Sequence, residues 1–232
     1  MMFLVIHKRR NIVVLTEIIT FLTKKESLNS LLEFWNPIFF TLLLYFGIRI
    51  FIAEARYIPS GSMLPGLKIK DRLVIEKLTY KTRDPKRGEI VVFNSPYSFD
   101  RKLKPSNEKS HIKCALLSLP LVNLIPGVIA PSCDAYIKRV IAIEGDKISI
   151  DHIGNVSING IKVNEPYVKN LCLSNQFGID KCPSIYTQVP GGHLLVLGDN
   201  RSNSWDSRFW PGGPFLPKDE IIGRAVWRFW PF

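Results

Sequence analysis

Residues 134–143 read DAYIKRVIAI, and this segment sets the class of fold. Its β-branched, aliphatic and aromatic residues are typical of a β-strand. Successive side chains of a strand point to opposite faces. One face would therefore carry Tyr136, Lys138, Val140 and Ala142, and the other Ile137, Arg139, Ile141 and Ile143. Lys138 is thus predicted to lie among apolar neighbours on its own face.

Other runs of the same kind lie before and after this strand: residues 72–77 (RLVIEK), 89–93 (EIVVF) and 193–197 (HLLVL). Residues 155–163 (NVSINGIKV) are two alternating runs around Asn159-Gly160. This dipeptide is a strong hairpin signal because both residues tolerate positive φ. The sequence therefore predicts a mainly β domain.

The composition agrees with a folded domain of ordinary size. The 232 residues are 46% hydrophobic and 22% charged, which excludes a disordered or fibrous chain. The 15 Gly and 16 Pro favour short strands joined by tight turns over long helical bundles. A net charge of +11 suits an anionic membrane surface and a nucleic acid equally well. Charge alone therefore does not identify the partner.

An apolar segment precedes the β region, at residues 31–53 (LLEFWNPIFFTLLLYFGIRIFIA). About 20 apolar residues cross a hydrocarbon core of about 30 Å, so the segment can span. Its charges, Glu33 and Arg49, lie near its ends, where Arg49 can extend to the interface. A cleaved signal peptide has a shorter apolar run and a small-residue cleavage site. We therefore predict a retained transmembrane anchor over residues 31–54, with a buried core helix as the alternative.

The charges upstream of the anchor predict its orientation. Lys24 and Lys25 lie on the N-terminal flank, which the positive-inside rule assigns to the cytoplasm. Residues 1–30 are then a cytoplasmic segment, and residues 55–232 form an exported domain. The short apolar run 12–22 contains Glu17 and is expected to be an amphipathic cytoplasmic piece. If it also crossed the membrane, the main domain would still lie outside.

Residues 95–135 have the composition of a large inserted lobe. A polar, basic part is followed by the apolar run 115–130 (ALLSLPLVNLIPGVIA). Pro120 and Pro126 interrupt that run, which makes it a poor spanning helix. We expect a lobe that dips into the membrane or covers the core.

The four cysteines leave several arrangements open. They are Cys114, Cys133, Cys172 and Cys182. An even number in an exported domain is compatible with disulfides, but three pairings exist and all four could be free thiols. There is no CxxC motif and no cluster of His residues, so no zinc site is expected.

A serine on a turn follows the anchor directly, in residues 58–65 (IPSGSMLP). Ser62 would be a nucleophile only if a base lay close to it. No histidine stands in a triad motif, and there is no GxSxG elbow. A lysine serves as the base when burial disfavours its ammonium form, and Lys138 has the apolar neighbours that this requires. The plainer alternatives are an ordinary turn serine and a strand lysine that extends to solvent.

A third segment, residues 198–208 (GDNRSNSWDSR), is dense in polar side chains and follows an apolar strand. It is either a solvated loop or a fixed hydrogen-bonded network that orients a catalytic group.

These segments together resemble the bacterial type I signal peptidases, the membrane-anchored Ser/Lys proteases of family S26. The resemblance rests on four motifs in the family's order: PSGSM at 59–63, RGEIVVF at 87–93, YIKRVIAIEGD at 136–146 and GDNRSNSWDSR. Residues 65–77 (PGLKIKDRLVIEK) look most similar to cyanobacterial members. The resemblance implies an antiparallel β fold that removes signal peptides from exported precursors at a lipid bilayer. It implies no metal, no organic cofactor and no nucleic acid.

The resemblance also assigns roles to individual residues. Ser62 matches the family's nucleophile, Lys138 its general base, and Ser60 the hydroxyl that helps to hold the oxyanion. Ser204 matches the serine that orients the lysine. A supporting ion-pair network would contain Arg139, Asp199, Asp206 and Arg208. The walls of the substrate pockets would include Pro59, Met63 and Ile143.

The chain also departs from the family pattern, at residues that affect support and shape. Many members have Asp where this chain has Ser202, and a small residue is common where it has Trp205. Gly and Pro are expected at the positions of Ala142 and Glu144.

Two other classes of protein could share part of this sequence pattern. A self-cleaving Ser/Lys protein of the LexA type would bind DNA, but it needs a helix-turn-helix domain where this chain has an apolar segment. A catalytically idle, membrane-tethered β domain that binds exported chains would not need the complete set of family residues. The outer compartment would be the periplasm, the extracellular space or a thylakoid lumen.

Overall fold

The computed structural model consists of two units, which are described separately. Contacts within the chain divide it into residues 1–50 and 51–232. The structure describes residues 33–100, 102–103, 135–169, 171–172 and 182–231. The apolar run 12–22, most of the predicted lobe 95–135, Cys114 and Cys133 lie outside these residues, so the expectations about them stay predictions.

A long apolar helix, Glu33–Ile52, follows the undescribed N-terminal residues. Its last turn is a π-helix, η1 (Ile48–Ile52). Within the described part of the chain it is the one helix that is long and apolar enough to cross a membrane, and none of its apolar window is buried. The alternative of a buried core helix is therefore wrong. The helix fits a single membrane span.

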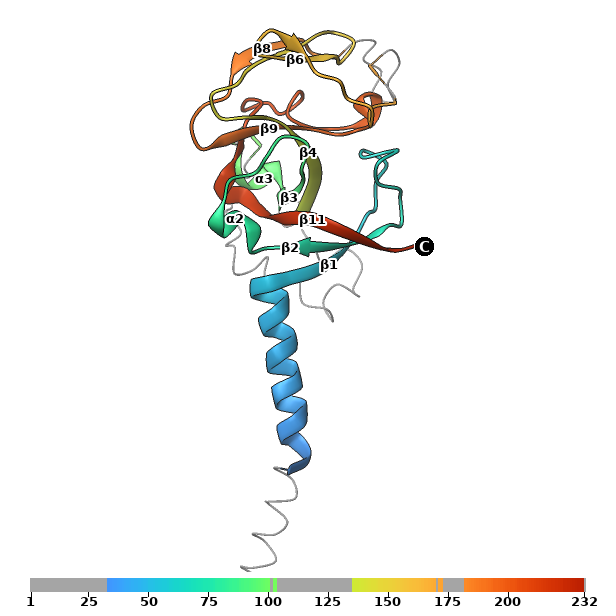
Figure 1. The fold of residues 1–232 in the computed structure, drawn as a ribbon, viewed down its shortest axis with the longest axis vertical. Helices are drawn as coiled ribbons and strands as arrows, with labels where there is room; N and C mark the ends of the chain where they lie inside the picture. The colour runs from blue at the N-terminus through green and yellow to red at the C-terminus, as the bar shows by residue number, and fades with distance from the viewer. Residues whose placement is uncertain (1–32, 101, 104–134, 170, 173–181, 232) are drawn as a thin grey trace, which may run out of the picture. The chain divides into compact units, whose positions relative to one another are not determined.

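The second unit is built from two antiparallel sheets (Figure 1). The larger sheet has the order β1-β2-β11-β3-β4-β9-β10. Its strands are β1 (Ala53–Tyr57), β2 (Arg72–Glu76), β3 (Ile90–Asn94), β4 (Ala135–Ile143), β9 (His193–Leu197), β10 (Leu216–Pro217) and β11 (Ile221–Trp230). The last strand, β11, lies between β2 and β3 and pairs with both. The predicted mainly β, antiparallel fold with an N-terminal apolar helix is confirmed.

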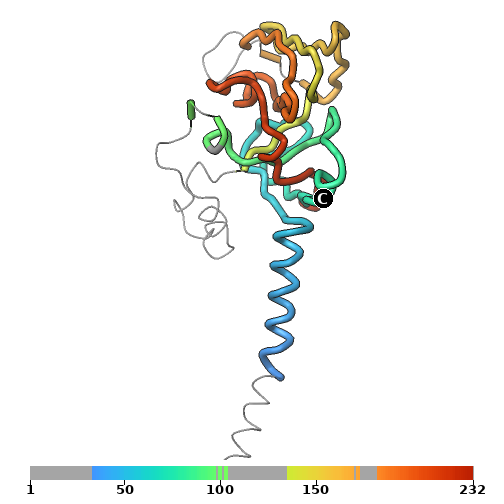
Figure 2. Tube along the Cα trace, turned by 90° about the vertical axis from the view of Figure 1, so that its left-hand side faces the viewer, coloured from blue at the N-terminus to red at the C-terminus, as the bar shows by residue number. Residues whose placement is uncertain are grey.

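The smaller sheet has the order β7-β6-β5-β8. Its strands are β5 (Lys147–Ile150), β6 (Val156–Ile158), β7 (Ile161–Lys162) and β8 (Ile185–Gln188). Asn159 and Gly160 connect β6 to β7 with φ angles of 53° and 83°, so the predicted hairpin is confirmed. Figures 1 and 2 both show this yellow and orange sheet over the part of the larger sheet that contains β4 and β9. The helices in this unit are short: α2 (Thr79–Thr82), α3 (Pro96–Phe99), η4 (Arg201–Asn203) and η5 (Lys218–Glu220).

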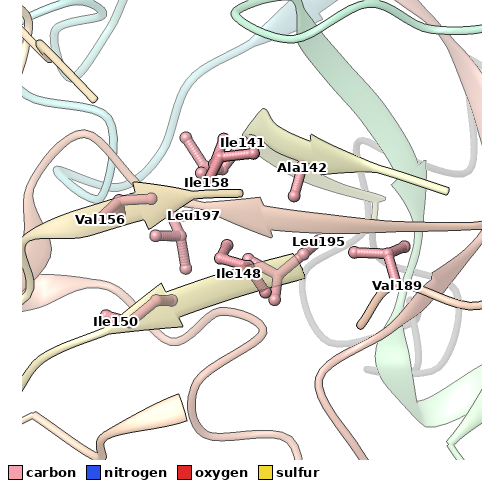
Figure 3. Packing of buried hydrophobic residues seen from close by; sticks show 9 residues of the cluster. All are labelled: Ile141, Ala142, Ile148, Ile150, Val156, Ile158, Val189, Leu195 and Leu197. Atoms are coloured by element: carbon pink, nitrogen blue, oxygen red, sulfur yellow. The ribbon is translucent and has the colours of Figure 1, made fainter. Parts of the chain in front are cut away.

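The apolar side chains that join the two sheets form one buried cluster, shown in Figure 3. The larger sheet contributes Ile141, Ala142, Leu195 and Leu197, and the smaller contributes Ile148, Ile150, Val156 and Ile158. At roughly 1.5–3 kcal/mol for each fully buried large aliphatic side chain, this cluster is a major source of stability.

A β-bulge corrects the predicted faces of β4. The register between β4 and β9 shifts between Val140 and Ala142. Ala142 therefore joins Ile141 in the cluster between the sheets, whereas Ile143 packs with Val140 against the opposite cluster. The strict alternation predicted from the sequence is wrong from Ala142 onward, because a bulge adds one residue to one strand of the pair.

A separate apolar cluster holds the serine turn in place. Ile58, Met63 and Leu67 from the turn pack with Leu73, Ile75 and Val92 from β2 and β3. Met63 is fully buried, and Ile58 retains 2% exposure. The turn that carries Ser62 is therefore fixed on the sheet by apolar residues on both sides of the serine.

Candidate active site

The central feature of the site is the contact between Ser62 and Lys138. Ser62 lies on the turn between β1 and β2, and Lys138 lies in β4. The Nζ atom of Lys138 is 2.9 Å from Oγ of Ser62 and 2.9 Å from the carbonyl oxygen of Ile137. The fold thus brings together two groups that are 76 residues apart in the sequence.

The surroundings of Lys138 favour a neutral amine. The residue is 3% exposed, and burial lowers the pKa of Lys138 to about 8. Burial acts in this direction because it disfavours the charged form. The carboxylates of Asp206 and Asp199 oppose the shift, and the guanidinium of Arg208 reinforces it. Burial therefore raises the share of the amine that is unprotonated near neutral pH.

The serine turn receives support from a residue that the sequence did not single out. The backbone N–H of Asn200 donates to the carbonyl of Ser62 at 3.1 Å. The side-chain amide of Asn200 donates to the carbonyl of Gly61 at 3.1 Å. Ser60, on the same turn, places its hydroxyl oxygen 3.5 Å from that of Ser62. Asn200 thus ties the loop after β9 to the turn that carries Ser62.

An ion pair joins this loop to the strand of the lysine. Arg139, which follows Lys138 in β4, donates from Nε and Nη2 to the carboxylate of Asp199 at 2.8 and 2.7 Å. The guanidinium also donates to the carbonyl of Gly88 at 2.7 Å. Gly66 is required nearby, because a Cβ there would come within 2.5 Å of the Asp199 carboxylate. In addition to their direct contact, the strand of Lys138 and the turn of Ser62 are thus connected through Arg139, Asp199 and Asn200.

A second ion pair lies wholly within the loop. Arg208 donates from Nε and Nη2 to the carboxylate of Asp206, both at 2.8 Å, and both side chains are fully buried. The N–H of Gly198 also donates to Asp206 at 2.9 Å. Burial raises the pKa of Asp206, but the charge and hydrogen bonds of Arg208 outweigh it, so the net pKa shift is downward. Asp206 is therefore ionised.

The disulfide Cys172–Cys182 lies against this second pair. The Nη1 atom of Arg208 is 3.0 Å from the sulfur of Cys172 and 2.6 Å from that of Cys182. Of the pairings that the sequence left open, the structure therefore contains the one between Cys172 and Cys182.

Ser204 is buried beside the pair formed by Ser62 and Lys138, but its contacts differ from the expected ones. It is 2% exposed, and its hydroxyl lies close enough to Asp206 to help lower the pKa of that carboxyl, although it makes no hydrogen bond of normal geometry within the described residues. The side chain packs closely against Gly198, where a Cβ would come within 2.2 Å of the Ser204 hydroxyl. The structure places Ser204 near the site without the predicted hydrogen bond to Lys138.

A cavity of about 540 Å³ opens beside Ser62 and Lys138. Pro59 lines it, as predicted, together with Tyr57, Ile137, Tyr136 and Trp205. The two other predicted wall residues lie elsewhere. Met63 is fully buried in the core below the turn. Ile143 lies roughly 13 Å along the strand from Lys138, because the bulge leaves about four steps of 3.3 Å between them, and it packs against another cluster.

A further network behind the Arg139–Asp199 pair was also absent from the sequence prediction. The guanidinium of Arg139 lies 4.1 Å from the ring centre of Tyr167, whose hydroxyl donates to Glu165 at 2.9 Å. Glu165 accepts from the buried Arg201 at 2.6 Å. The contacts of Arg139 with Tyr167 and of Arg201 with Glu165 join residues that are far apart in sequence, so only the folded chain reveals them. No group of three or more His, Cys, Asp or Glu residues suited to a metal ion occurs in the part of the chain that the structure describes.

A buried, partly neutral lysine amine in contact with a turn serine at a cavity is the constellation of a serine hydrolase that uses lysine as its base. A family model described as "Signal peptidase, peptidase S26" matches residues 31–230. The chain belongs to this family of serine peptidases, which remove signal peptides from exported proteins.

Named relatives agree with the family assignment. The chain is 40% identical over 214 residues to probable signal peptidase I-2 of Synechocystis sp., covering 90% of this chain and 78% of that protein. It is 40% identical over 203 residues to signal peptidase I of Leptolyngbya laminosa, covering 88% and 81%. It is 34% identical over 187 residues to thylakoidal processing peptidase 1, chloroplastic, of Arabidopsis thaliana, covering 79% and 44%. The similarity to cyanobacterial signal peptidases that the sequence indicated is confirmed.

Proposed function

We propose that Ser62 is the nucleophile and Lys138 the general base with which this chain cleaves signal peptides. The observation that carries the proposal is the 2.9 Å distance between Lys138 Nζ and Ser62 Oγ, two residues that are both buried at the edge of the cavity. A lysine can accept a proton only when it is neutral, and burial lowers its pKa to about 8.

The reaction follows from this geometry. Neutral Lys138 accepts the proton of Ser62 as Oγ attacks the scissile carbonyl carbon. The Ser60 hydroxyl and the Ser62 N–H stabilise the negative charge that develops on the carbonyl oxygen. The protonated lysine then gives its proton to the leaving amine as the C–N bond breaks. Lys138 next accepts a proton from the water molecule that attacks the acyl-enzyme, and Ser62 is released with its proton restored.

The remaining predicted residues act on this pair as positioning groups. Arg139 and Asp199 connect the strand of the lysine to Asn200, which holds the serine turn by two hydrogen bonds. Asp206 and Arg208 keep the loop that carries Ser204 against the site.

The substrate is a peptide segment ahead of the mature part of an exported protein, bound in extended form in the cavity beside β4. Extended peptides bind next to strands because their backbone groups can form hydrogen bonds there. A cavity of about 540 Å³ shared by several substrate residues favours small side chains next to the cleaved bond. Ala-x-Ala sequences meet this requirement.

The helix Glu33–Ile52 would tether the enzyme to the bilayer in which its substrates are also held. Such tethering raises the effective concentration of each for the other. Residues 1–30 would be cytoplasmic, and the β unit would lie on the outer side. Protease added to sealed vesicles of known orientation should degrade the β unit only from that side, and protection there would contradict this topology.

The test of the catalytic proposal uses the full chain in detergent micelles and a precursor with an Ala-x-Ala site. We expect Ser62→Ala and Lys138→Ala to abolish cleavage. Ser60→Ala should reduce kcat by about 10²–10³, the usual cost of one lost oxyanion donor. Lys147→Ala and Ser157→Ala, on the small sheet, serve as matched controls and should keep the parent rate. Full activity in Ser62→Ala or Lys138→Ala would overturn the assignment.

A further inference from the structure

Trp205 is part of the wall of the cavity, and its backbone is fixed on both sides. The preceding residue, Ser204, is 2% exposed, and the following residue, Asp206, is fully buried. Asn203 and Trp205 both line the cavity, whereas Ser204 between them does not line it and packs against Gly198. Trp205 therefore faces the cavity from a short segment in which the residues before and after it are buried.

The two flanking residues give Trp205 little freedom to retreat. Ser204 packs so closely on Gly198 that a Cβ at that glycine would lie 2.2 Å from the serine hydroxyl. Asp206 accepts hydrogen bonds from the N–H of Gly198 and from Arg208. A shift of the segment away from the cavity would break these buried contacts. The backbone under the indole is therefore rigid.

Aromatic neighbours hold the indole itself. Its ring centre lies 5.8 Å from that of Tyr136 and 5.9 Å from that of Tyr97. Tyr136 also lines the cavity and precedes Lys138 by two residues in β4, so both side chains lie on the same face. Rings at these separations attract each other. Trp205 and Tyr136 thus form a fixed aromatic wall next to the amine of Lys138.

We propose that Trp205 is a specificity-determining residue that limits the size of one substrate side chain next to the cleaved bond. This inference rests on the proposed function, because it assumes that the cavity beside Ser62 and Lys138 receives the substrate. Because this wall cannot move, a substrate side chain that is too large for the cavity would clash with it. Discrimination of about 10–200-fold for a single methylene is typical of such apolar pockets.

The experiment compares cleavage of matched peptides by the parent full-length chain and by Trp205→Ala in micelles. The peptides contain an Ala-x-Ala site, and each has Leu or Phe in place of one residue, from the third before the cleaved bond to the second after it. We expect Trp205→Ala to raise the ratio of kcat/KM for a bulky peptide to that for the Ala peptide by about tenfold or more at one position. Trp205→Phe, which keeps a ring against Tyr136, should give a smaller gain at the same position.

Two controls separate this inference from other effects. Trp227→Ala removes an exposed indole of β11 that does not line the cavity, and it should leave every ratio unchanged. Binding of the same peptides to Ser62→Ala, with and without Trp205→Ala, measures size selection without any cleavage. If both cleavage and binding ratios stay within twofold at all positions, the inference is wrong. If the binding ratios change as expected but the parent does not cleave, the proposed catalytic roles fail and the role of Trp205 stands.

Discussion

Two Asp–Arg pairs lie near Ser62 and Lys138, and they differ in what they join. Arg139 and Asp199 come from different elements, 60 residues apart, and 14% of the Arg139 side chain is accessible. Arg208 and Asp206 belong to one loop, two residues apart, and neither is accessible. We expect the first pair to affect mainly where the serine turn lies relative to β4. We expect the second pair to affect mainly the shape and stability of the loop.

An Asp–Arg ion pair can thus have two different physical effects, depending on which parts of the chain it joins. A pair that bridges distant elements transmits position, so its loss should change catalysis more than stability. A fully buried pair leaves an uncompensated charge when one partner is removed, so its loss should change stability more than position. The roles of the two pairs can be distinguished by measuring both the free energy of unfolding and kcat for the same variants.

The largest effect is expected from Arg208→Met, which nearly keeps the volume but leaves Asp206 buried without its cation. Breaking a buried pair in this way costs about 3–5 kcal/mol. Denaturant unfolding of the full chain in micelles, followed by near-UV circular dichroism, measures the loss. An unfolding free energy within about 1 kcal/mol of the parent, which is the order of the uncertainty of the extrapolation to zero denaturant, would remove the distinction between the pairs.

A smaller loss of stability is expected from Asp199→Asn. The substitution keeps the size and one acceptor, and Arg139 retains its bond to Gly88 and some contact with water. We expect about 1–2 kcal/mol from the weakened charged hydrogen bonds. The value of kcat should fall while KM changes little, because the connection to Asn200 is loosened. A loss of stability equal to that of Arg208→Met, with kcat unchanged, would reverse the roles of the two pairs.

The pH dependence of cleavage sharpens the comparison further. With a Lys138 pKa of about 8, the neutral base becomes scarcer below that pH, so kcat/KM should rise with pH and level off above it. Both aspartates raise this pKa against the effect of burial, Asp206 more than Asp199. Asp206→Asn should therefore move the midpoint to lower pH, and Asp199→Asn should move it less. An upward shift in either variant would contradict the electrostatic assignment.

The smallest effect is expected from Lys218→Ala. This lysine pairs with Asp84 and Glu144, whose side chains are 73% and 50% accessible. Exposed pairs contribute little because water and salt screen them. The unfolding midpoint should stay within error of the parent at all salt concentrations. A clear loss of stability in Lys218→Ala that becomes smaller as salt is added would contradict this expectation. The surface pairs would then contribute to stability as much as the two pairs of the site.

Local patterns predicted a large part of the fold. The strands β2, β3 and β9 and the hairpin at Asn159-Gly160 follow from alternation and turn preferences, which act over a few residues. The pattern failed at the bulge after Val140, because a bulge depends on the register with the partner strand β9 and leaves no local signal.

The part of the site that could be predicted from the sequence is the part that depends on the chemical nature of single residues. The sequence indicated Ser62 and Lys138 as partners, and the fold places their reacting atoms in contact. It did not indicate Asn200, Tyr167 or Glu165, whose contacts arise only when separate segments meet. It also misplaced Met63 and Ile143, because a residue near the serine or lysine in sequence can point into the core.

The central place of β11 in the larger sheet has a consequence for how the enzyme is made. The strand that follows the Ser62 turn, β2, and the strand that pairs with β4, β3, are neighbours of β11 rather than of each other. A ribosome releases Ser62 and Lys138 long before β11, so the nascent polypeptide lacks the piece that unites the two halves. The enzyme should therefore become able to cleave peptides only late in its synthesis. A chain whose translation stalls before β11 should not cleave other proteins.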